Sequence, residues 1–283
     1  MARYETISFM SDYGRVDEFV GVVHSVIRSI VPDVAVVDIT HDVAHHDVRG
    51  GGLLLARAAQ YLVPGVVLAV VDPGVGGDRR RIAVEVGGGV SVLVGPDNGL
   101  LAPAVALVGG ADRAVELTSE DFHLPAPGPT FDGRDVFGPV AAHLAAGVDL
   151  AEFGPPLNPA TLVPAVVPVT RTEDDGVHAE VLWVDTFGNV QLNVDPAELD
   201  DMGERVAVAT GGTTTVCRRC DTYADIGPGA VGVVVDSYGM TSLAANRASA
   251  AEALGVTSGA EVILSAATDE PSVTTAVELG RRS

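Results

Sequence analysis

The first half of the chain alternates short β-branched runs with amphipathic segments, and this order constrains the fold most. Segments 4–10, 34–39 and 66–71 are rich in β-branched residues and bounded by polar or turn residues, which is typical of buried strands. Segments 16–31 and 48–62 carry apolar residues at helical spacing and end at prolines. Because β-α-β crossovers are right-handed, this order predicts a mostly parallel sheet covered by helices on both faces.

The second half has a different texture. A Pro-rich and then acidic stretch follows Gly154, and the short strands beyond it predict a small β-barrel or sandwich. We therefore predict an N-terminal α/β domain over 1–165, a linker over 166–176 and a C-terminal β domain over 177–283. The remaining expected elements are strands at 81–86, 90–94, 179–184, 190–194, 205–209, 213–216, 231–235 and 262–265, and helices at 134–146 and 248–254.

The chain is strongly acidic, with 38 acidic and 17 basic side chains, a formal charge of -21 and no Lys. Such a surface repels phosphate backbones and anionic membranes, so we expect neither nucleic acid nor a membrane as a partner. The first residues lack a basic region followed by an apolar one, and the apolar stretches are too short to span a bilayer. We expect a cytoplasmic protein.

The two cysteines, Cys217 and Cys220, form a single CRRC pair. A four-ligand zinc site of the common type needs a second pair, and a thioredoxin-like motif needs a βαβ context that this region lacks. We interpret them as ordinary thiols in a turn between strands.

Polar residues follow the first three predicted strands, where open parallel sheets bind ligands. These residues are Asp12, Asp42 and Asp72, and each alone is commonly a cap or turn residue. Asp72 is followed seven residues later by Arg79, and a Gly-rich loop lies between them. Loops of this type can expose their backbone N–H groups to a ligand. The spacing matches neither a Walker A nor a GxGxxG motif, which disfavours nucleotide-triphosphate chemistry.

A second constellation is dense in residue types that ligate metals. Its members are His41, Asp42, His45, His46 and Asp47. Their order matches no spacing of a known metal geometry, and adjacent histidines do not easily face one ion. A metal-dependent hydrolase centred here stays an alternative, but we expect no metal.

Two further segments combine polar and aromatic residues. Segment 129–139 places Asp132 and Asp135 around a glycine before a helix, so Asp135 is either a helix cap or a site residue. Segment 183–193 interrupts a strand pattern with Phe187 next to an amide. This segment is either a bulged hairpin or a surface that stacks a purine ring.

A set of motifs runs from about Ile7 to Leu254, nearly the whole chain. In order, they are FMSDYG, VVDITHDVAHHDV, VVDPGVGGDRR, GPDNGLL, TFDGRDVFGPVAAHLAAG, VDTFGNVQLN, TYADI and the stretch from DSYG to AAN. The ordered set resembles the S-adenosyl-L-methionine (SAM) hydroxide adenosyltransferase family, which also includes fluorinases and chlorinases. The resemblance implies an N-terminal α/β domain, a C-terminal β-barrel, and a homotrimer whose sites lie between one subunit's first domain and a neighbour's second.

The resemblance also implies the residues that bind SAM. Asp12 would hold the ribose hydroxyls, and Asp185 and Ser237 would hold the methionine ammonium and carboxylate. The residues implied around the adenosyl group are Phe131, Phe187, Asn189, Tyr223 and the backbone near Arg247.

The implied catalytic residues are Asp72, Arg79 and Asp132. In the halogenating members an uncharged residue stands at the position of Asp72, because a carboxylate there repels halide. The hydroxide-transferring pattern is TFHGRD, whereas this chain has Asp132 in place of the histidine. Two carboxylates near one water are expected to share a proton, and His46 is a candidate substitute base.

The leading hypothesis is hydrolysis of SAM to adenosine and L-methionine by attack of water on the ribose C5', without a cofactor. One alternative is halide transfer to the same carbon. Another is a non-catalytic protein that binds an adenosyl ligand.

Overall fold

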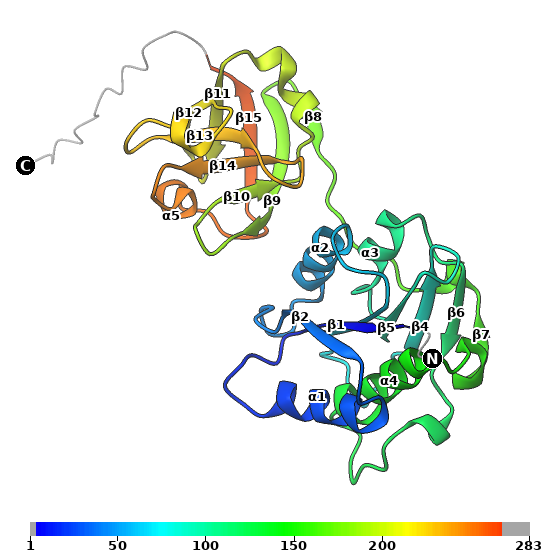
Figure 1. Cartoon of the computed structure of the whole chain (residues 1–283). Coiled ribbons are helices and arrows are strands. Elements are labelled where there is room, and N and C mark those ends of the chain that lie inside the picture. The colour runs from blue at the N-terminus through cyan, green and yellow to red at the C-terminus, as the bar shows by residue number, and fades with distance from the viewer. Residues whose placement is uncertain (1–3, 268–283) are drawn as a thin grey trace, which may run out of the picture. The chain divides into compact units, whose positions relative to one another are not determined.

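The computed structural model describes residues 4–267, which Figure 1 draws in colour. The chain divides into two compact units, Met1–Val167 and Pro168–Ser283. The predicted linker, 166–176, spans the point of division and contains strand β8 (Arg171–Glu173), which pairs with β9 (Gly176–Val184). In the described part of the chain, no helix combines the length and apolar character that crossing a membrane requires.

The first unit is built on a seven-stranded mixed sheet with the order β2-β1-β3-β5-β4-β6-β7. The β2-β1-β3-β5 half is parallel, and β4, β6 and β7 add antiparallel pairings. The carboxyl ends of β1 and β3 therefore lie side by side. The strands are β1 (Thr6–Ser11), β2 (Ala35–Thr40), β3 (Val66–Val70), β4 (Arg81–Val86), β5 (Ser91–Pro96), β6 (Arg113–Glu116) and β7 (Pro156–Leu157).

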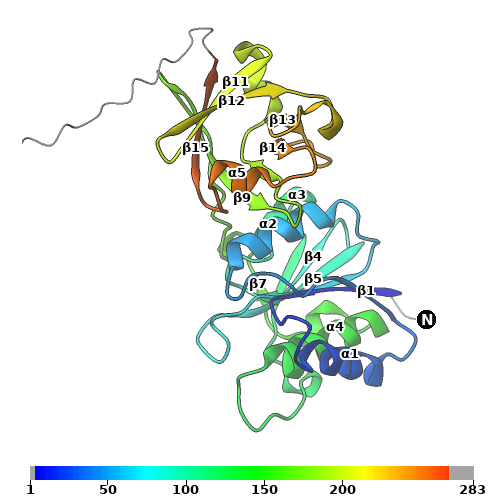
Figure 2. The ribbon, with the colours of Figure 1, turned by 90° about the vertical axis from the view of Figure 1, so that its left-hand side faces the viewer.

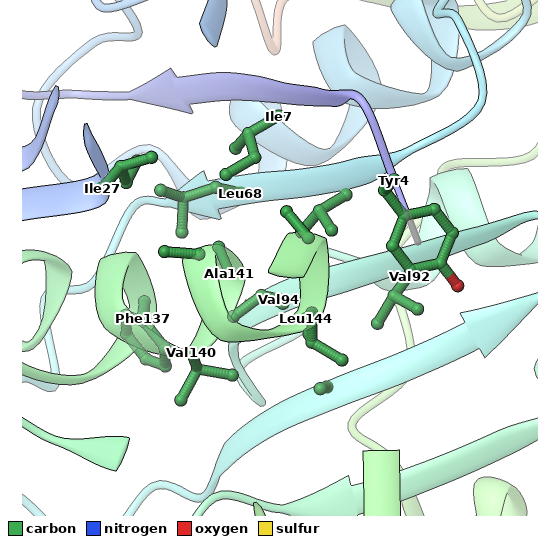
Figure 3. Close-up of a cluster of buried hydrophobic side chains, with 14 of the residues drawn as sticks. Tyr4, Ile7, Ile27, Leu68, Val92, Val94, Phe137, Val140, Ala141 and Leu144 are labelled. Carbon is green, nitrogen blue, oxygen red and sulfur yellow. The ribbon is translucent and has the colours of Figure 1, made fainter. Parts of the chain in front are cut away.

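Helices cover both faces of this sheet, as Figure 2 shows. Helices α1 (Phe19–Ile30) and α4 (Gly138–Ala146) pack together on one face, and α2 (Val48–Ala59) and α3 (Ala102–Leu107) on the other. Figure 3 shows the first of these layers, where Val140 and Leu144 of α4 face strand residues such as Val94. Because both faces of the sheet are covered by apolar layers, we look for polar side chains that can do chemistry at the strand ends.

Several predicted elements differ from the structure in detail. The strand predicted over 34–39 is not a buried one, because β2 is an edge strand and none of its six residues is buried. The first helix begins at Phe19, and Val16 is 98% exposed before it. The predicted helix 134–146 is a π-helical turn, Gly133–Phe137, followed by α4. The sequence reading also missed α3 and β6.

The second unit is a closed barrel. Its strands pair in the cycle β9-β10-β14-β13-β12-β11-β15-β9, and β8 lies outside the cycle beside β9. Alternating small aliphatic residues fill its centre, which is typical of a small barrel. The bounds are β10 (Val190–Leu192), β11 (Arg205–Thr210), β12 (Thr213–Arg219), β13 (Val231–Val235), β14 (Thr241–Ala245), β15 (Glu261–Ala266) and one helix, α5 (Ala250–Leu254).

The predicted fold class, an α/β domain followed by a small β-barrel, is confirmed. Strands β8 and β14 were missed. The sequence of β14, TSLAA, has a low β-propensity, yet four of its five residues are buried between β10 and β13. Tertiary pairing therefore decides this strand, not local preference.

Candidate active site

The first unit contains a cavity of about 260 Å³ at the carboxyl ends of the parallel strands. Asp12, which follows β1, and Asp72, which follows β3, both line it. Asp42, the third acidic residue at a predicted strand end, lies instead within 3.5 Å of Arg15 at the surface. The cavity therefore gathers two of the three strand-end aspartates, as expected for neighbouring parallel strands.

Two of the carboxylates that line the cavity, those of Asp72 and Asp132, are bridged by one guanidinium, that of Arg79. Nε of Arg79 donates to both carboxylate oxygens of Asp72, at 2.9 and 3.1 Å, and its NH2 group donates to Oδ2 of Asp72 and Oδ2 of Asp132. The side chains of Asp72 and Asp132 are 5% and 4% exposed. Such charge-assisted, forked bonds hold side chains in one geometry. Both carboxylates raise the pKa of Arg79 despite its burial, so it stays charged.

A second arginine, which the sequence reading did not select, also binds this cluster. Nε of Arg81, the first residue of β4, donates a 2.8 Å hydrogen bond to Oδ2 of Asp132. The signal was the run of three arginines from 79 to 81. Alternate residues of an extended segment point the same way, so Arg79 and Arg81 face Asp132 while Arg80 binds Asp97.

Asp132 also lines a second cavity, of about 540 Å³, together with Arg81 and His123. Burial, and then the charge of Arg81, lower the pKa of His123 below its usual value. The ring is therefore neutral near pH 7. Asp132 thus lies between two cavities, and Arg81 approaches it from the larger one.

Two glycines allow the loops around the cluster to approach closely. Gly76, in the loop between Asp72 and Arg79, has φ +77°, and a Cβ there would lie 2.6 Å from the carbonyl oxygen of Pro129. Gly133, after Asp132, has the hydroxyl of Tyr13 where a Cβ would project. A larger side chain at either position would clash with these atoms, so glycine is needed for the loops to approach each other this closely.

Aromatic side chains also line the cavity and form an aromatic wall of Tyr13, Phe19 and Phe131. Phe131 packs edge-to-face against Tyr13 and Phe19, with ring centroids 5.5 and 5.2 Å away. Burial, followed by the charges of Asp12, Asp72 and other carboxylates, raises the pKa of Tyr13 far above its usual value. Tyr13 therefore stays a neutral hydroxyl in the site. Tyr13 belongs to the motif FMSDYG, in which only Asp12 was predicted as a site residue.

Asp12 and His46 are linked through the backbone. The N–H of His46 donates to Oδ2 of Asp12 at 2.9 Å, and His46 has φ 67°, which is uncommon for a residue other than glycine. His45 Nδ1 lies 2.8 Å from the carbonyl oxygen of Asp12. Both histidines line the cavity, so this strained turn presents two imidazoles beside Asp12.

The other members of the metal-type constellation do not gather at one point. Asp47 accepts a bond from Gly50 N at 2.8 Å and caps α2. The ring of His41 is buried against Ser11, whose Oγ lies 2.7 Å from its Nδ1. The clusters of possible ligands among residues 4–267 include His41, but not Asp42, His45, His46 or Asp47.

Asp135 is bound to a neighbour and does not cap a helix. Arg134 donates to its two carboxylate oxygens from Nε at 2.6 Å and from NH2 at 2.9 Å. The guanidinium of Arg134 lies over the ring of Phe131, 5.0 Å from its centroid. The pair therefore supports the aromatic wall from behind.

The hairpin between β9 and β10 holds three of the residues implied for the second unit. Asp185 accepts bonds from the backbone N–H of Phe187 at 2.9 Å and of Asn189 at 2.8 Å, and from Asn189 Nδ2 at 2.8 Å. These bonds order the turn and leave the ring of Phe187 79% exposed. The segment is a hairpin whose register shifts between Gln191 and Leu192, and its turn presents an aromatic face. Stacking of a purine ring on this face stays a prediction.

Tyr223, Ser237 and Arg247 lie in other connections of the barrel. The ring of Tyr223 is 47% exposed, and burial of part of it, followed by the charges of Asp185 and Asp236, raises the pKa of its hydroxyl. Ser237 and Arg247 are exposed, and Arg247 has φ 58°. The sequence reading missed Asp236, which accepts a 2.6 Å bond from Gln191 Nε2 and a 2.9 Å bond from Tyr238 N.

Both cysteines are free thiols. Cys217 lies in β12 with its side chain in the barrel core, and burial raises its pKa to about 11. This agrees with the interpretation of Cys217 and Cys220 as ordinary thiols, although Cys217 lies within a strand and not in a turn.

Sequence models of one family match both units. The description of the first is SAM hydroxide adenosyltransferase N-terminal domain, and it matches residues 7–154. The description of the second is the C-terminal domain of the same family, and it matches residues 179–263.

Curated proteins that resemble the chain fall into two groups. A protein named (R)-S-adenosyl-L-methionine hydrolase from Salinispora tropica is 48% identical, over 92% of this chain and 97% of its own length. A protein of the same name from Thermus thermophilus is 40% identical, over 91% of this chain and 98% of its own. A fluorinase from an Actinoplanes species is 28% identical, over 92% of this chain and 97% of its own length.

Among solved structures, an uncharacterised conserved protein from Thermotoga maritima is similar, with a TM-score of 0.84 and 32% identity. The match covers 92% of this chain and 99% of that one.

Proposed function

The chain belongs to the SAM hydroxide adenosyltransferase family, and we propose that it hydrolyses SAM to adenosine and L-methionine. The oxygen of water forms a bond to the ribose C5' as the C5'–S bond breaks. The electron pair of that bond leaves with sulfur, which becomes the neutral thioether of methionine, and one proton is released. Relatives at 48% and 40% identity are named as hydrolases of this substrate, whereas the fluorinase is only 28% identical.

The observation that carries the proposal is the pairing of Asp72 and Asp132 through Arg79 at the wall of the strand-end cavity. Water is a poor nucleophile, and its attack needs a group that orients it and takes its proton. Two carboxylates fixed by one guanidinium supply such a group. They also disfavour chloride or fluoride as the nucleophile, because a halide beside them is repelled.

We assign different tasks to the two carboxylates. Asp72 meets Arg79 with both oxygens and fixes the guanidinium. Asp132 receives Arg79 and Arg81 on the same oxygen, Oδ2, and within residues 4–267 no arginine bond reaches its Oδ1. Oδ1 of Asp132 is therefore the better placed acceptor for the proton of the attacking water. It takes the role that a histidine has in the pattern TFHGRD.

Asp12 and the aromatic wall would hold the adenosyl group. A carboxylate accepts hydrogen bonds from both hydroxyls of a ribose, and Asp12 lines the cavity with its backbone and side chain fixed by the turn of His45 and His46. Phe131 supplies an apolar surface beside it. We place His46 among the binding residues, at the rim.

The residues of the barrel would hold the rest of the substrate. Phe187 and Tyr223 offer exposed rings for stacking, and Asn189, Asp185, Ser237 and the backbone near Arg247 offer polar contacts. Large exposed aromatic side chains commonly mark a surface that meets a ligand or another subunit. We propose a homotrimer in which this surface completes the cavity of a neighbouring subunit.

We propose further that the enzyme works in the cytoplasm and needs no cofactor. The sulfonium of SAM already makes its sulfur a good leaving group, and displacement by water involves no net oxidation or reduction. The net charge of -21 supports small molecules, not nucleic acid or a membrane surface, as partners.

The test is a product assay in ¹⁸O-labelled water, with and without high chloride. Hydrolysis places one label on the 5'-oxygen of adenosine. Appearance of 5'-chloro-5'-deoxyadenosine would instead establish halide transfer. Tight SAM binding without either product would establish a binding protein.

Mixed subunits test whether a site is shared. Asp72→Asn and Phe187→Ala each remove one half of it, and Phe187 is exposed, so its loss should not disturb folding. If sites form between subunits, a mixture of the two variants assembled together regains activity, because some sites combine two intact halves. No regain in mixed trimers would place both halves in one chain, and a monomer in light scattering would exclude the trimer.

A further inference from the structure

Two histidines and one aspartate meet at the edge of the parallel sheet, outside the cavity described above. His24 lies on α1, Asp38 on the edge strand β2, and His41 directly after β2. His24 Nε2 is 2.8 Å from Asp38 Oδ1, and His41 Nε2 is 3.1 Å from the same oxygen. The three atoms all lie within 4.8 Å of one another. None of the three residues lines the cavity.

The spacing of these atoms fits ligands of one ion. Ligand atoms 2.0–2.2 Å from a transition ion, at tetrahedral to octahedral angles, lie about 2.8–3.6 Å from their neighbours. The distances from Asp38 to the two imidazoles, 2.8 and 3.1 Å, fall within this interval. Two of the three separations thus already suit one ion, and the third, between the two imidazole nitrogens, is at most 4.8 Å.

The ring of His41 is held as the rings of metal-binding histidines usually are. Its outer nitrogen, Nδ1, contacts Ser11 Oγ at 2.7 Å, and such a contact fixes both the tautomer and the direction of the ring. Its Nε2 is buried and makes no hydrogen bond of acceptable geometry, although Asp38 lies 3.1 Å away. The side chain is 1% exposed, so this nitrogen is aimed at the cluster with no partner that satisfies it.

We propose that His24, Asp38 and His41 form a site for a divalent transition ion of the zinc class. Two imidazole nitrogens and a carboxylate oxygen suit Zn²⁺ better than Ca²⁺ or Mg²⁺, which prefer oxygen ligands throughout. The side chains of His24 and Asp38 are 29% and 30% exposed, so an ion has a route from solvent and water completes its coordination.

The ion would brace the strand ends that carry Asp12. The carbonyl of His41 accepts a 2.8 Å bond from Gly14 N, and Ser11, which contacts the His41 ring, precedes Asp12 in the chain. A bound ion would therefore tie α1, β2 and the end of β1 together. Its role is structural, since the ion would lie away from the reacting atoms.

The second cluster of possible ligands in residues 4–267 makes a useful contrast. It consists of Glu173, Asp175 and His178, with one imidazole and two exposed carboxylates. His178 already contacts Asp175 at 2.8 Å and Glu261 at 3.4 Å. This cluster has no buried nitrogen without a partner, so we expect no ion there.

Calorimetric titration of the chelator-treated full chain with Zn²⁺ tests the proposal without any measurement of catalysis. We expect one tight site per chain, a melting temperature that rises with Zn²⁺, and an affinity at least about tenfold lower in His24→Ala and Asp38→Asn. His178→Ala is the matched control and should bind as the wild type does. Both ligand changes are at partly exposed residues, and circular dichroism checks that the variants fold.

Titration with Co²⁺ identifies the ligands. Visible bands without a thiolate charge-transfer band, lost in His24→Ala, would support the site. A thiolate band would place the ion on Cys217 or Cys220 and overturn the proposal. Wild-type protein that binds no Zn²⁺, or binding that His24→Ala and Asp38→Asn leave unchanged, would show a hydrogen-bonded cluster only.

Discussion

Arg81 donates from Nε to Oδ2 of Asp132 at 2.8 Å, and Arg79 binds the same oxygen. The carboxylate of Asp132 is thereby held by two guanidinium groups, and both of these bonds are to Oδ2 and not to Oδ1. Arg81 does not line the cavity of about 260 Å³. It acts on the reaction through Asp132, as a positioning residue.

Arg81→Ala should lower kcat and leave KM nearly unchanged. A hydrogen bond to a charged group contributes about 1.5–3 kcal/mol, which corresponds to a loss of about tenfold or more in kcat if it is needed only for orientation. Steady-state kinetics with SAM measure the two parameters separately. Arg28→Ala, at an exposed position of α1, is the control. An equal rise in KM would mean that Arg81 contacts the substrate.

Asp132→Asn should lower kcat by about two orders of magnitude, since an amide keeps the shape but accepts no proton. Asp132→His should retain more activity, because an imidazole also acts as a base. Its ordinary pKa is about 6.5, and the adjacent arginines lower it, so the variant should lose activity on the acid side at a higher pH than the wild type. Profiles of kcat against pH measure this. Identical profiles would remove Asp132 from the proton transfer.

Asp72→Asn should also lower turnover by about two orders of magnitude while SAM binding largely persists. The amide cannot form the fork with Arg79, so the guanidinium loses its orientation toward Asp132. Single-turnover kinetics give the rate, and equilibrium dialysis gives the binding. Turnover equal to that of the wild type would exclude Asp72 from the mechanism.

The approach of Asp12 to Asp72 could be predicted from the sequence because carboxyl ends of neighbouring parallel strands share one edge of a sheet. The meeting of Arg79 with Asp132 could not be predicted from spacing. These residues are 53 positions apart, and the path between them includes β4, β5, α3 and β6. Only the family motifs pointed to that pair, and no motif pointed to Arg81.

The histidines after β2 are close in the sequence but do not form one cluster in the structure. His41 stands close to His45 and His46 in the sequence, but its ring contacts Ser11 and Asp38, whereas His45 and His46 contact Asp12. Residues that are close in the sequence therefore belong to different clusters. The partner His24 comes from a helix packed on the same sheet, which no local pattern reveals.

Cys217 provides a prediction in which pH acts on stability. Burial raises its pKa in the folded chain to about 11, above the value of about 8.5 of an exposed thiol. A raised folded pKa favours the protonated thiol, so its contribution to the free energy of unfolding is complete below about pH 8.5 and is lost as pH rises toward 11. Urea titrations across this interval should show a falling free energy of unfolding in the wild type. The free energy of unfolding of Cys217→Val should fall less steeply, since other alkaline groups are common to both proteins.

The same burial predicts the reactivity of the two thiols. At pH 8 Ellman's reagent should react with Cys220 in the native chain and with Cys217 only after unfolding. Rapid labelling of both would contradict the burial of Cys217 in the barrel.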